Sequence, residues 1–172
     1  MVAKRVGIIG HGAITRILTS TLIANDPEGL RVQIVGILVR EARVSETCTA
    51  AEVTAPAARV VSSVPALLAL KPTVVVECAG QDAVRQYGTA VLGGGADLMV
   101  ISSGALADDS VRDALVAAAA AGGSRLSVPP GAIAGLDGLG ALRMGGLDAV
   151  TYTSTKPPDA WRGTPAGAPG LQ

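Results

Sequence analysis

A chain of 172 residues can bury the core of one domain, or of one domain and part of a second, but it is too short for two full domains. Its 14 basic and 14 acidic side chains leave no net charge, and no run of Lys or Arg is long enough to follow a phosphate backbone. No stretch approaches the roughly 18 consecutive apolar residues of a membrane span, so we expect neither nucleic acid nor a membrane as a partner.

The two cysteines, Cys48 and Cys78, stand alone in the sequence, without the C-x-x-C spacing of metal and redox sites. Isolated cysteines of this kind are typical of buried free thiols in a reducing compartment. We therefore expect a cytoplasmic protein with no metal site.

Apolar runs of strand length recur through the first 128 residues. Most are rich in Val and Ile and do not alternate with polar residues, which is typical of strands covered on both faces. We expect strands at residues 5–9, 32–39, 59–61, 73–76, 98–101 and 125–128. Segments with helical spacing lie between them, at residues 14–24, 64–70, 83–92 and 110–121. This alternation predicts an α/β fold with a parallel sheet and right-handed crossovers.

The first predicted strand and the first predicted helix are joined by GHGAIT, residues 10–15. A G-x-G-x-x-G pattern between a strand and a helix is the dinucleotide-binding turn of Rossmann domains. Gly10 allows the tight turn, Gly12 has no Cβ to obstruct a pyrophosphate, and the amides up to Ile14 point at that anion from the helix N-terminus. We therefore predict a Rossmann-type doubly wound sheet that binds NAD or NADP, with Gly10, Gly12, Ala13 and Ile14 as contacts. The alternative is that the glycines only turn the chain.

Two other residues of this turn depart from the simplest pattern. Thr15 stands where the pattern has Gly or Ala, so we expect looser packing between helix and strand. His11 we interpret as an exposed loop residue that faces solvent or a ribose, and not as a catalyst.

The second predicted strand ends at Val39-Arg40-Glu41. An acid at such a strand end bonds the ribose hydroxyls of NAD. Arg40 instead offers a planar guanidinium that suits a 2′-phosphate, so we predict it as a cofactor contact. NAD and NADP stay open as alternatives, and so does an Arg40 that is an ordinary surface residue.

Small and polar residues follow the later predicted strands, in the segments ECAG, SSGA and PPGA. Ligands of such sheets bind beyond the carboxyl ends of the strands. This position adds five predicted contacts, which are Ala79, Gly80, Ser103, Gly104 and Ala105. Glu77 either helps to position a cationic group or substrate or caps the following helix, and capping is the commoner role of a strand-end acid.

The pattern changes after residue 128, where two prolines and a glycine interrupt it. Residues 134–142 predict a short helix, and residues 147–154 alternate like a strand with one exposed face. From residue 156 the tail KPPDAWRGTPAGAPGLQ is too rich in Pro and Gly to hold a fold by itself. We interpret residues 1–130 as a dinucleotide-binding domain, and residues 131–172 as the incomplete beginning of a second domain with a Pro/Gly-rich tail.

The ordered set GHGAIT, VVVECAGQDAV, SSGALAD, PPGAIAGLDGL and GGLDAVTYTSTKPPDAW resembles the L-aspartate dehydrogenases over residues 5–164. The resemblance implies NAD(P)-dependent oxidative deamination of L-aspartate to iminoaspartate, which hydrolyses to oxaloacetate and ammonia, in NAD biosynthesis. It also implies a second α/β domain for catalysis and dimerisation and a homodimer in the complete protein, and it adds Ala132 to the predicted cofactor contacts.

The same resemblance places the family's catalytic histidine after the K-P-x-x-A-W stretch, near which this sequence ends. The only histidine is His11, in the predicted phosphate turn, so we assign no catalytic residue. We expect a truncated chain that carries mainly the cofactor-binding half. The alternatives are a non-catalytic dinucleotide-binding module, a truncated inactive product, or another Rossmann reductase of the homoserine dehydrogenase or dihydrodipicolinate reductase type.

Overall fold

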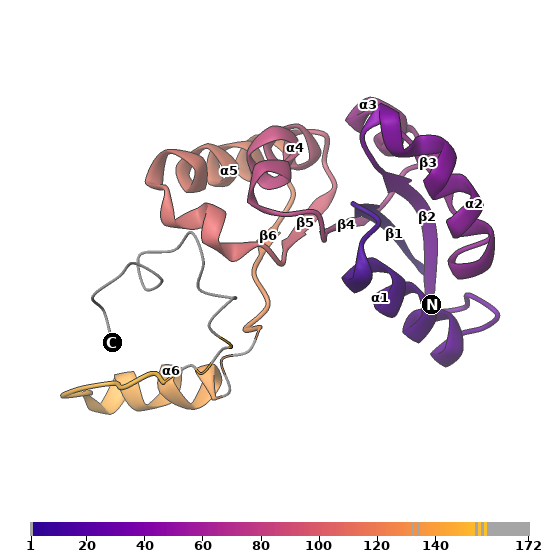
Figure 1. Ribbon diagram of the computed structural model, residues 1–172. Coiled ribbons are helices and arrows are strands. Elements are labelled where there is room, and N and C mark those ends of the chain that lie inside the picture. The colour runs from indigo at the N-terminus through magenta and orange to yellow at the C-terminus, as the bar shows by residue number, and fades with distance from the viewer. Residues whose placement is uncertain (1, 132, 134, 154, 156, 158–172) are drawn as a thin grey trace. The chain divides into compact units, whose positions relative to one another are not determined.

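The computed structural model describes residues 2–131, 133, 135–153, 155 and 157 (Figure 1). The chain divides into two units, Met1–Gly131 and Ala132–Gln172. Within the described residues, no helix is both long enough and apolar enough to cross a membrane.

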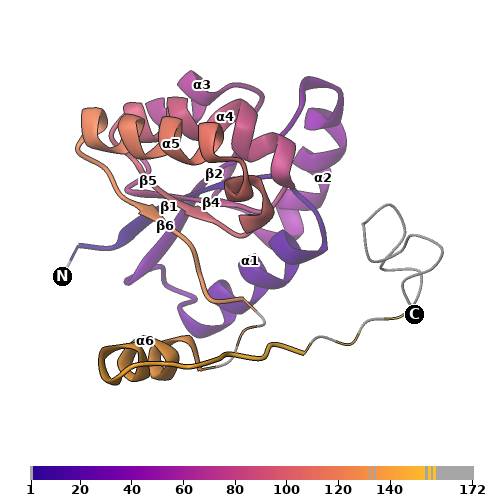
Figure 2. The ribbon, with the colours of Figure 1, turned by 90° about the vertical axis from the view of Figure 1, so that its left-hand side faces the viewer.

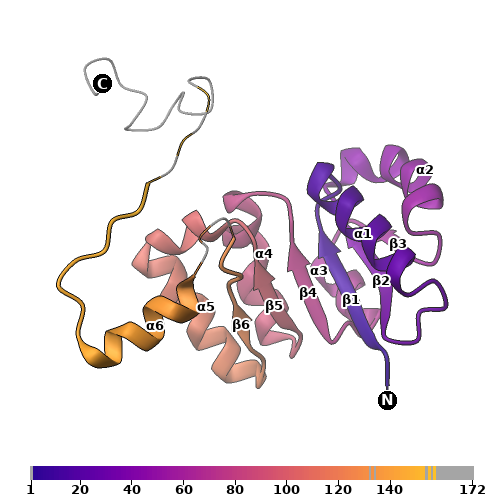
Figure 3. The same ribbon diagram turned by 90° about the horizontal axis from the view of Figure 1, so that it is seen from below.

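The first unit is built on a six-stranded sheet in the order β3-β2-β1-β4-β5-β6 (Figure 3). All neighbouring strands are parallel. The strands are β1 (Lys4–Ile9), β2 (Val32–Leu38), β3 (Arg59–Val61), β4 (Val74–Glu77), β5 (Asp97–Val100) and β6 (Leu126–Ser127). The predicted Rossmann-type, doubly wound α/β fold is therefore confirmed.

The strand order reverses at β1, which has β2 on one side and β4 on the other. The register aligns Ile9 of β1 with Leu38 of β2 and with Glu77 of β4. The carboxyl ends of these three strands therefore lie level with one another. A crevice forms at such a reversal because the connections leave the two neighbouring strands in opposite directions.

Helices cover both faces of the sheet (Figure 2). The α-helices of this unit are α1 (Ala13–Asn25), α2 (Val44–Thr54), α3 (Val64–Ala69), α4 (Gln81–Gly93) and α5 (Asp109–Gly122). Short 3-10 turns occupy η1 (Glu41–Arg43) and η2 (Ser103–Ala107). One apolar cluster joins the sheet to α3, α4 and α5, and the other joins it to α1 and α2.

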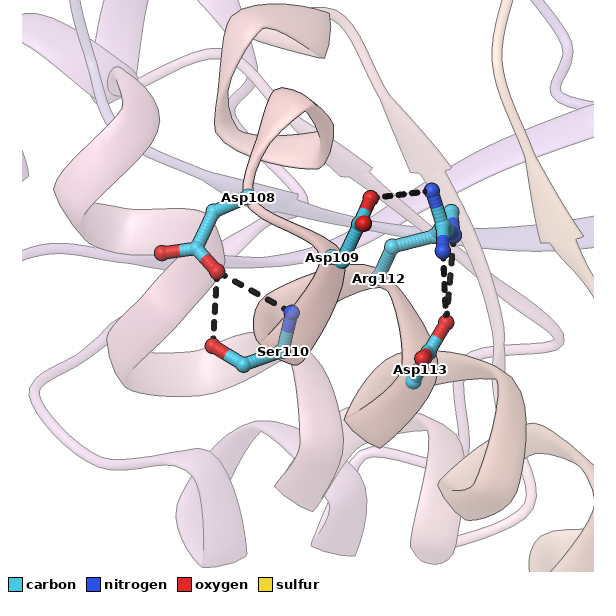
Figure 4. A network of polar contacts seen from close by, with 5 residues as sticks. All are labelled: Asp108, Asp109, Ser110, Arg112 and Asp113. Atoms are coloured by element: carbon cyan, nitrogen blue, oxygen red, sulfur yellow. Dashed lines mark hydrogen bonds and ion pairs between the residues drawn. The ribbon is translucent and has the colours of Figure 1, made fainter.

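Helix α5 shows how local sequence sets these boundaries. The Asp108 carboxylate accepts hydrogen bonds from the Ser110 amide, at 3.0 Å, and from the Ser110 hydroxyl, at 2.6 Å, which caps the first turn (Figure 4). One turn along, Arg112 pairs with both Asp109 and Asp113. The helix ends where Gly123 adopts the left-handed conformation, with φ of 63°.

Helix α2 was absent from the elements expected from sequence. Its buried side chains are Thr47 and Ala51, and Ala55 follows at the same spacing just after the helix. Such small and polar residues give no apolar stripe, so the periodicity that marks α1 and α4 is missing from this segment.

The second unit contains α6 (Leu136–Gly145), which confirms a helix near residues 134–142. The strand expected at residues 147–154 is wrong for its described part, because residues 147–153 form no strand. A strand needs a hydrogen-bonded neighbour, and alternation of residue types does not supply one. The cysteine prediction is also wrong in part, since Cys48 is exposed, although neither cysteine forms a disulfide.

Candidate dinucleotide site

A cleft of about 530 Å³ lies at the carboxyl ends of β1, β2 and β4. One wall is the turn after β1, another is the segment from Val39 to Thr47 that follows β2, and a third is the start of α4. This is the crevice at the reversal of strand order, where doubly wound sheets bind their ligands.

The glycine turn forms one wall of the cleft, and its two glycines have different roles. Gly10 has φ of 94°, and a Cβ on it would lie 2.7 Å from the Cβ of Ala79. The turn after β1 therefore touches the segment after β4, and only glycine fits there. A Cβ on Gly12 would meet no protein atom within 4 Å. Gly12 thus leaves open space beside the backbone.

Helix α1 begins at this open space, and no group in the described part of the chain caps its first amides. Its N-cap is Gly12, which makes no side-chain cap, and its first turn carries no acid. The first intrahelical bond runs from the Arg16 amide to the Gly12 carbonyl, at 3.1 Å. The preceding amides have no helical acceptor, and they carry the positive end of the helix dipole. An anion placed at Gly12 is stabilised by both.

Thr15 stands at the third small position of the fingerprint. It is 0% exposed, and its hydroxyl donates to the carbonyl of Gly10 at 3.0 Å. This bond fixes the carbonyl at the entrance of the turn, and it satisfies the buried hydroxyl within the turn itself. Looser packing between α1 and β1 stays a prediction.

Glu77 is also 0% exposed, and its carboxylate joins two of the strand-end segments. One oxygen accepts the amides of Ala79 and Gly80, each at 2.7 Å, and the hydroxyl of Ser102 at 3.1 Å. The other oxygen accepts the Ser102 amide at 3.0 Å. Since Gly80 is the N-cap of α4, Glu77 caps that helix and ties it to the segment after β5. The amides it uses are not available to a ligand.

Two side chains in the lining of the cleft hold buried polar atoms that have no hydrogen-bond partner in the described part of the chain. They are the Nε2 of His11 and the Oγ1 of Thr47. An unsatisfied buried polar group costs about 1–3 kcal/mol, and such groups gather at functional sites. His11 is half-buried, not exposed as expected. Burial, and then the charges of Arg16 and Arg43, lower the pKa of this imidazole, which keeps it neutral.

Cys78 lines the same cleft but is not a nucleophile. Burial raises the pKa of its thiol to about 11, so the thiolate is scarce at neutral pH.

The structure brings some of the predicted contacts into the cleft and leaves others at its margin. Gly10, Gly12, Arg40 and Ala79 line it. Ala13 and Ile14 lie exposed in the first turn of α1. Gly80, at the start of α4, and the η2 residues Ser103, Gly104 and Ala105 are not part of its lining, and Ala105 is fully buried. Ala132 lies outside the described residues.

Sequence reasoning missed the polar lining residues Arg16, Arg43 and Thr47, as well as Asp82, Gln86 and Tyr87 of α4. Arg16 follows the fingerprint directly, and its place on the first turn of α1 could have been read from the pattern. Arg43 and Thr47 reach the cleft only through η1 and α2, for which no signal was recognised.

The other features of the described residues do not compete with this cleft as a cofactor site. A second hollow, of about 590 Å³, lies at the amino-terminal edge of β2. The Asp26 carboxylate in its lining is occupied by the amides of Leu30, Arg31 and Val32. Within the described ranges, no group of three or more His, Cys, Asp or Glu side chains could hold a metal ion.

Residues 6–129 match the family described as homoserine dehydrogenase, NAD binding domain. L-aspartate dehydrogenase 1 of Bordetella pertussis is 46% identical over 159 residues, which cover 91% of this chain and 56% of that protein. The chain therefore spans little more than half the length of the curated relatives it matches.

Two solved structures share the fold. The aspartate dehydrogenase of Thermotoga maritima has a TM-score of 0.56 and 24% identity, covering 82% of this chain and 52% of that chain. The WlbA dehydrogenase of Bordetella pertussis, in complex with NADH and UDP-GlcNAcA, has a TM-score of 0.60 and 23% identity, covering 74% of this chain and 35% of that chain. At these identities the likeness concerns the fold alone.

Proposed function

Because the chain belongs to the family of homoserine dehydrogenase-type NAD-binding domains and its relatives are L-aspartate dehydrogenases, we propose that it carries the cofactor-binding part of an NAD(P)-dependent L-aspartate dehydrogenase. The reaction oxidises the Cα–N bond of L-aspartate to iminoaspartate, which water converts to oxaloacetate and ammonia. We place it in NAD biosynthesis and in the cytoplasm, where free thiols such as Cys48 and Cys78 persist.

The observation that carries the proposal is the open space at Gly12 against the uncapped N-terminus of α1. A pyrophosphate at this position accepts hydrogen bonds from the first amides of the helix and meets no side chain. When bound, NAD(P)⁺ supplies the hydride acceptor, a chemistry that no side chain provides.

The residues of the chain hold and orient that cofactor. Gly10, Gly12, Ala13 and Ile14 form the phosphate turn, and Arg40 lies on the side of the adenosine ribose. Ala79 lines the wall beyond β4. Glu77 acts indirectly, since it fixes the segments after β4 and β5 relative to each other.

The predicted contacts at the margin of the cleft follow from the strand-end argument and the family resemblance. They are Gly80, Ser103, Gly104, Ala105 and Ala132. We assign residues 1–130 to the dinucleotide-binding domain, and residues 131–172 to the beginning of the catalytic and dimerisation domain of a homodimer. We assign no catalytic residue, because the only histidine of the chain, His11, lies in the phosphate turn.

The test is a calorimetric titration of the chain with NAD⁺ and with NADP⁺, followed by an assay of L-aspartate-dependent NAD(P)H formation. Binding that Gly12→Ala weakens supports the proposed cofactor site. Turnover with L-aspartate supports the complete reaction, whereas binding without turnover identifies a cofactor-binding module. A folded chain that binds neither dinucleotide contradicts the proposal.

A further inference from the structure

The end of the cleft over β2 is lined by more positive than negative charge. Arg16, Arg40 and Arg43 all belong to its lining, and Asp82, on the first turn of α4, is the one acid among the lining residues. Glu46 pairs with Arg43 at 2.8 Å. Among the described residues, Arg16 and Arg40 form no ion pair. Two guanidinium groups beside the cleft thus have no carboxylate partner.

Thr47 adds a hydroxyl to the same end. On helix α2, the hydroxyls of Thr49 and Thr54 donate to the carbonyls four residues earlier. Thr47 makes no such bond, although it is only 1% exposed and its Oγ1 is buried. The side chain therefore holds an unused donor and acceptor in the lining of the cleft, close to the arginine of η1 four residues before it.

His11, on the turn after β1, also lines the cleft. Its buried Nε2 likewise has no hydrogen-bond partner in the described part of the chain. The charges of Arg16 and Arg43 act on this ring, which places it in the same positive field. Among the described residues that line the cleft after β2, none is an acid that would bind ribose hydroxyls: Arg40 is the second residue beyond the strand, and Glu41 is not part of the lining.

We propose that this end of the cleft is a phosphomonoester subsite for the 2′-phosphate of NADP(H), formed by Arg40, Arg43 and Thr47, so that the chain prefers NADP(H) to NAD(H). The inference rests on the proposed function, because it concerns the adenosine end of the same cofactor. The phosphate dianion forms bidentate ion pairs with the guanidinium groups of Arg40 and Arg43. It also accepts a hydrogen bond from the Thr47 hydroxyl. His11 and Arg16 border the subsite from the turn and from α1.

The first experiment compares NADP⁺ with NAD⁺, and 2′,5′-ADP with 5′-AMP, by calorimetry on the unmodified chain. Each pair differs by the 2′-phosphate alone. We expect the phosphorylated member of each pair to bind about 10- to 100-fold more tightly, the gain of one or two charge-assisted hydrogen bonds. Inorganic phosphate, which lacks the nucleoside, is expected to compete only at far higher concentration.

Variants then test the named residues. Thr47→Val removes the hydroxyl at nearly constant shape, and Arg40→Gln removes the charge. Both are expected to lower the NADP⁺ affinity at least about 5-fold and to leave the NAD⁺ affinity within about 2-fold. The matched controls are Thr49→Val on the exposed side of the same helix and Arg112→Gln on α5, where Figure 4 shows the arginine between two aspartates. Neither control is expected to change the ratio of the two affinities.

Equal affinity for NADP⁺ and NAD⁺ would overturn the subsite and leave the proposed function standing. The subsite is also wrong if Thr47→Val and Thr49→Val behave alike, or if inorganic phosphate competes as well as 2′,5′-ADP does. A chain that binds neither dinucleotide contradicts the inference and the proposed function together. The Thr47 hydroxyl has no hydrogen-bond partner in the described part of the chain. Because Thr47→Val therefore breaks no hydrogen bond there, this variant is expected to unfold at the same urea concentration as the parent chain or at a higher one.

Discussion

Gly10 and Gly12 stand two residues apart, and the structure predicts opposite consequences for the same substitution at each. Gly12 has φ of −102°, which alanine adopts freely, and its Cβ would enter open space. Alanine is a somewhat poorer N-cap than glycine, so Gly12→Ala should cost less than about 1 kcal/mol of unfolding free energy. The new methyl, however, occupies the space in which a pyrophosphate approaches the amides of α1. Loss of one charge-assisted hydrogen bond, about 1.5–3 kcal/mol, weakens NAD(P)⁺ binding about 10- to 150-fold.

Gly10→Ala should damage the fold itself. The residue has φ of 94°, and the new Cβ would lie 2.7 Å from the Cβ and 3.0 Å from the Cα of Ala79. Left-handed strain of about 1–2 kcal/mol and overpacking of about 1–3 kcal/mol add to about 2–5 kcal/mol of destabilisation. Urea unfolding followed by circular dichroism measures the stabilities, and calorimetry measures the affinities under conditions where both variants are folded. The reasoning is refuted if Gly12→Ala destabilises the chain as much as Gly10→Ala, or if it binds NAD(P)⁺ like the parent chain.

Three further predictions concern single groups. Glu77→Gln replaces one carboxylate oxygen by an amide NH₂, which then faces backbone amides such as those of Ala79 and Ser102 that donate hydrogen bonds. The free energy of unfolding in urea should therefore fall by about 1–3 kcal/mol. An unchanged urea midpoint would contradict the capping role of Glu77. The amides that donate to Asp26, Val32 foremost, lower the pKa of this carboxyl, so its contribution to stability is present above about pH 4 and is lost as the pH falls through the folded-state pKa. Asp26→Asn should therefore flatten the acid side of the stability profile, and an unaltered acid limb would contradict this. With a pKa of about 11, Cys78 should resist iodoacetamide at about pH 8 while the exposed Cys48 is alkylated, and equal labelling by peptide mass spectrometry would refute its burial.

The sheet could be predicted from the sequence because its strands are continuous runs of β-branched residues. β1 and β4 lie within one residue of their expected bounds, and both are buried by helices on two faces. Helix α2 could not be predicted, because its sequence has no large apolar residues at helical spacing, whereas α1, which also buries two threonines, carries Ile17, Leu18 and Leu22. The expected strand at residues 147–154 shows the converse error. Its alternation is a local property, whereas a strand depends on a partner elsewhere in the chain.

The same division holds in the candidate site. Gly10 and Gly12 could be recognised because the turn, the strand before it and the helix after it are contiguous in sequence. The partners of Glu77 could not, since Ser102 follows it by 25 residues and meets it only through the pairing of β4 with β5. Arg43 lies in η1 and Thr47 in α2, so the two segments that sequence reasoning missed supply two of the three proposed phosphate contacts.

The arrangement of acids explains why an anion would choose α1 among the helices that start beyond the carboxyl ends of the central strands. At α4, Glu77 already takes the amides of Ala79 and Gly80, and Asp82 places a second negative charge in the first turn. At α5, Asp108 caps the helix and Asp109 follows it. Each of these helix dipoles is therefore neutralised by the chain's own carboxylates. Of these three helices, α1 alone begins with a glycine and no acid in the described part of the chain, and its positive end lies at the reversal of the strand order.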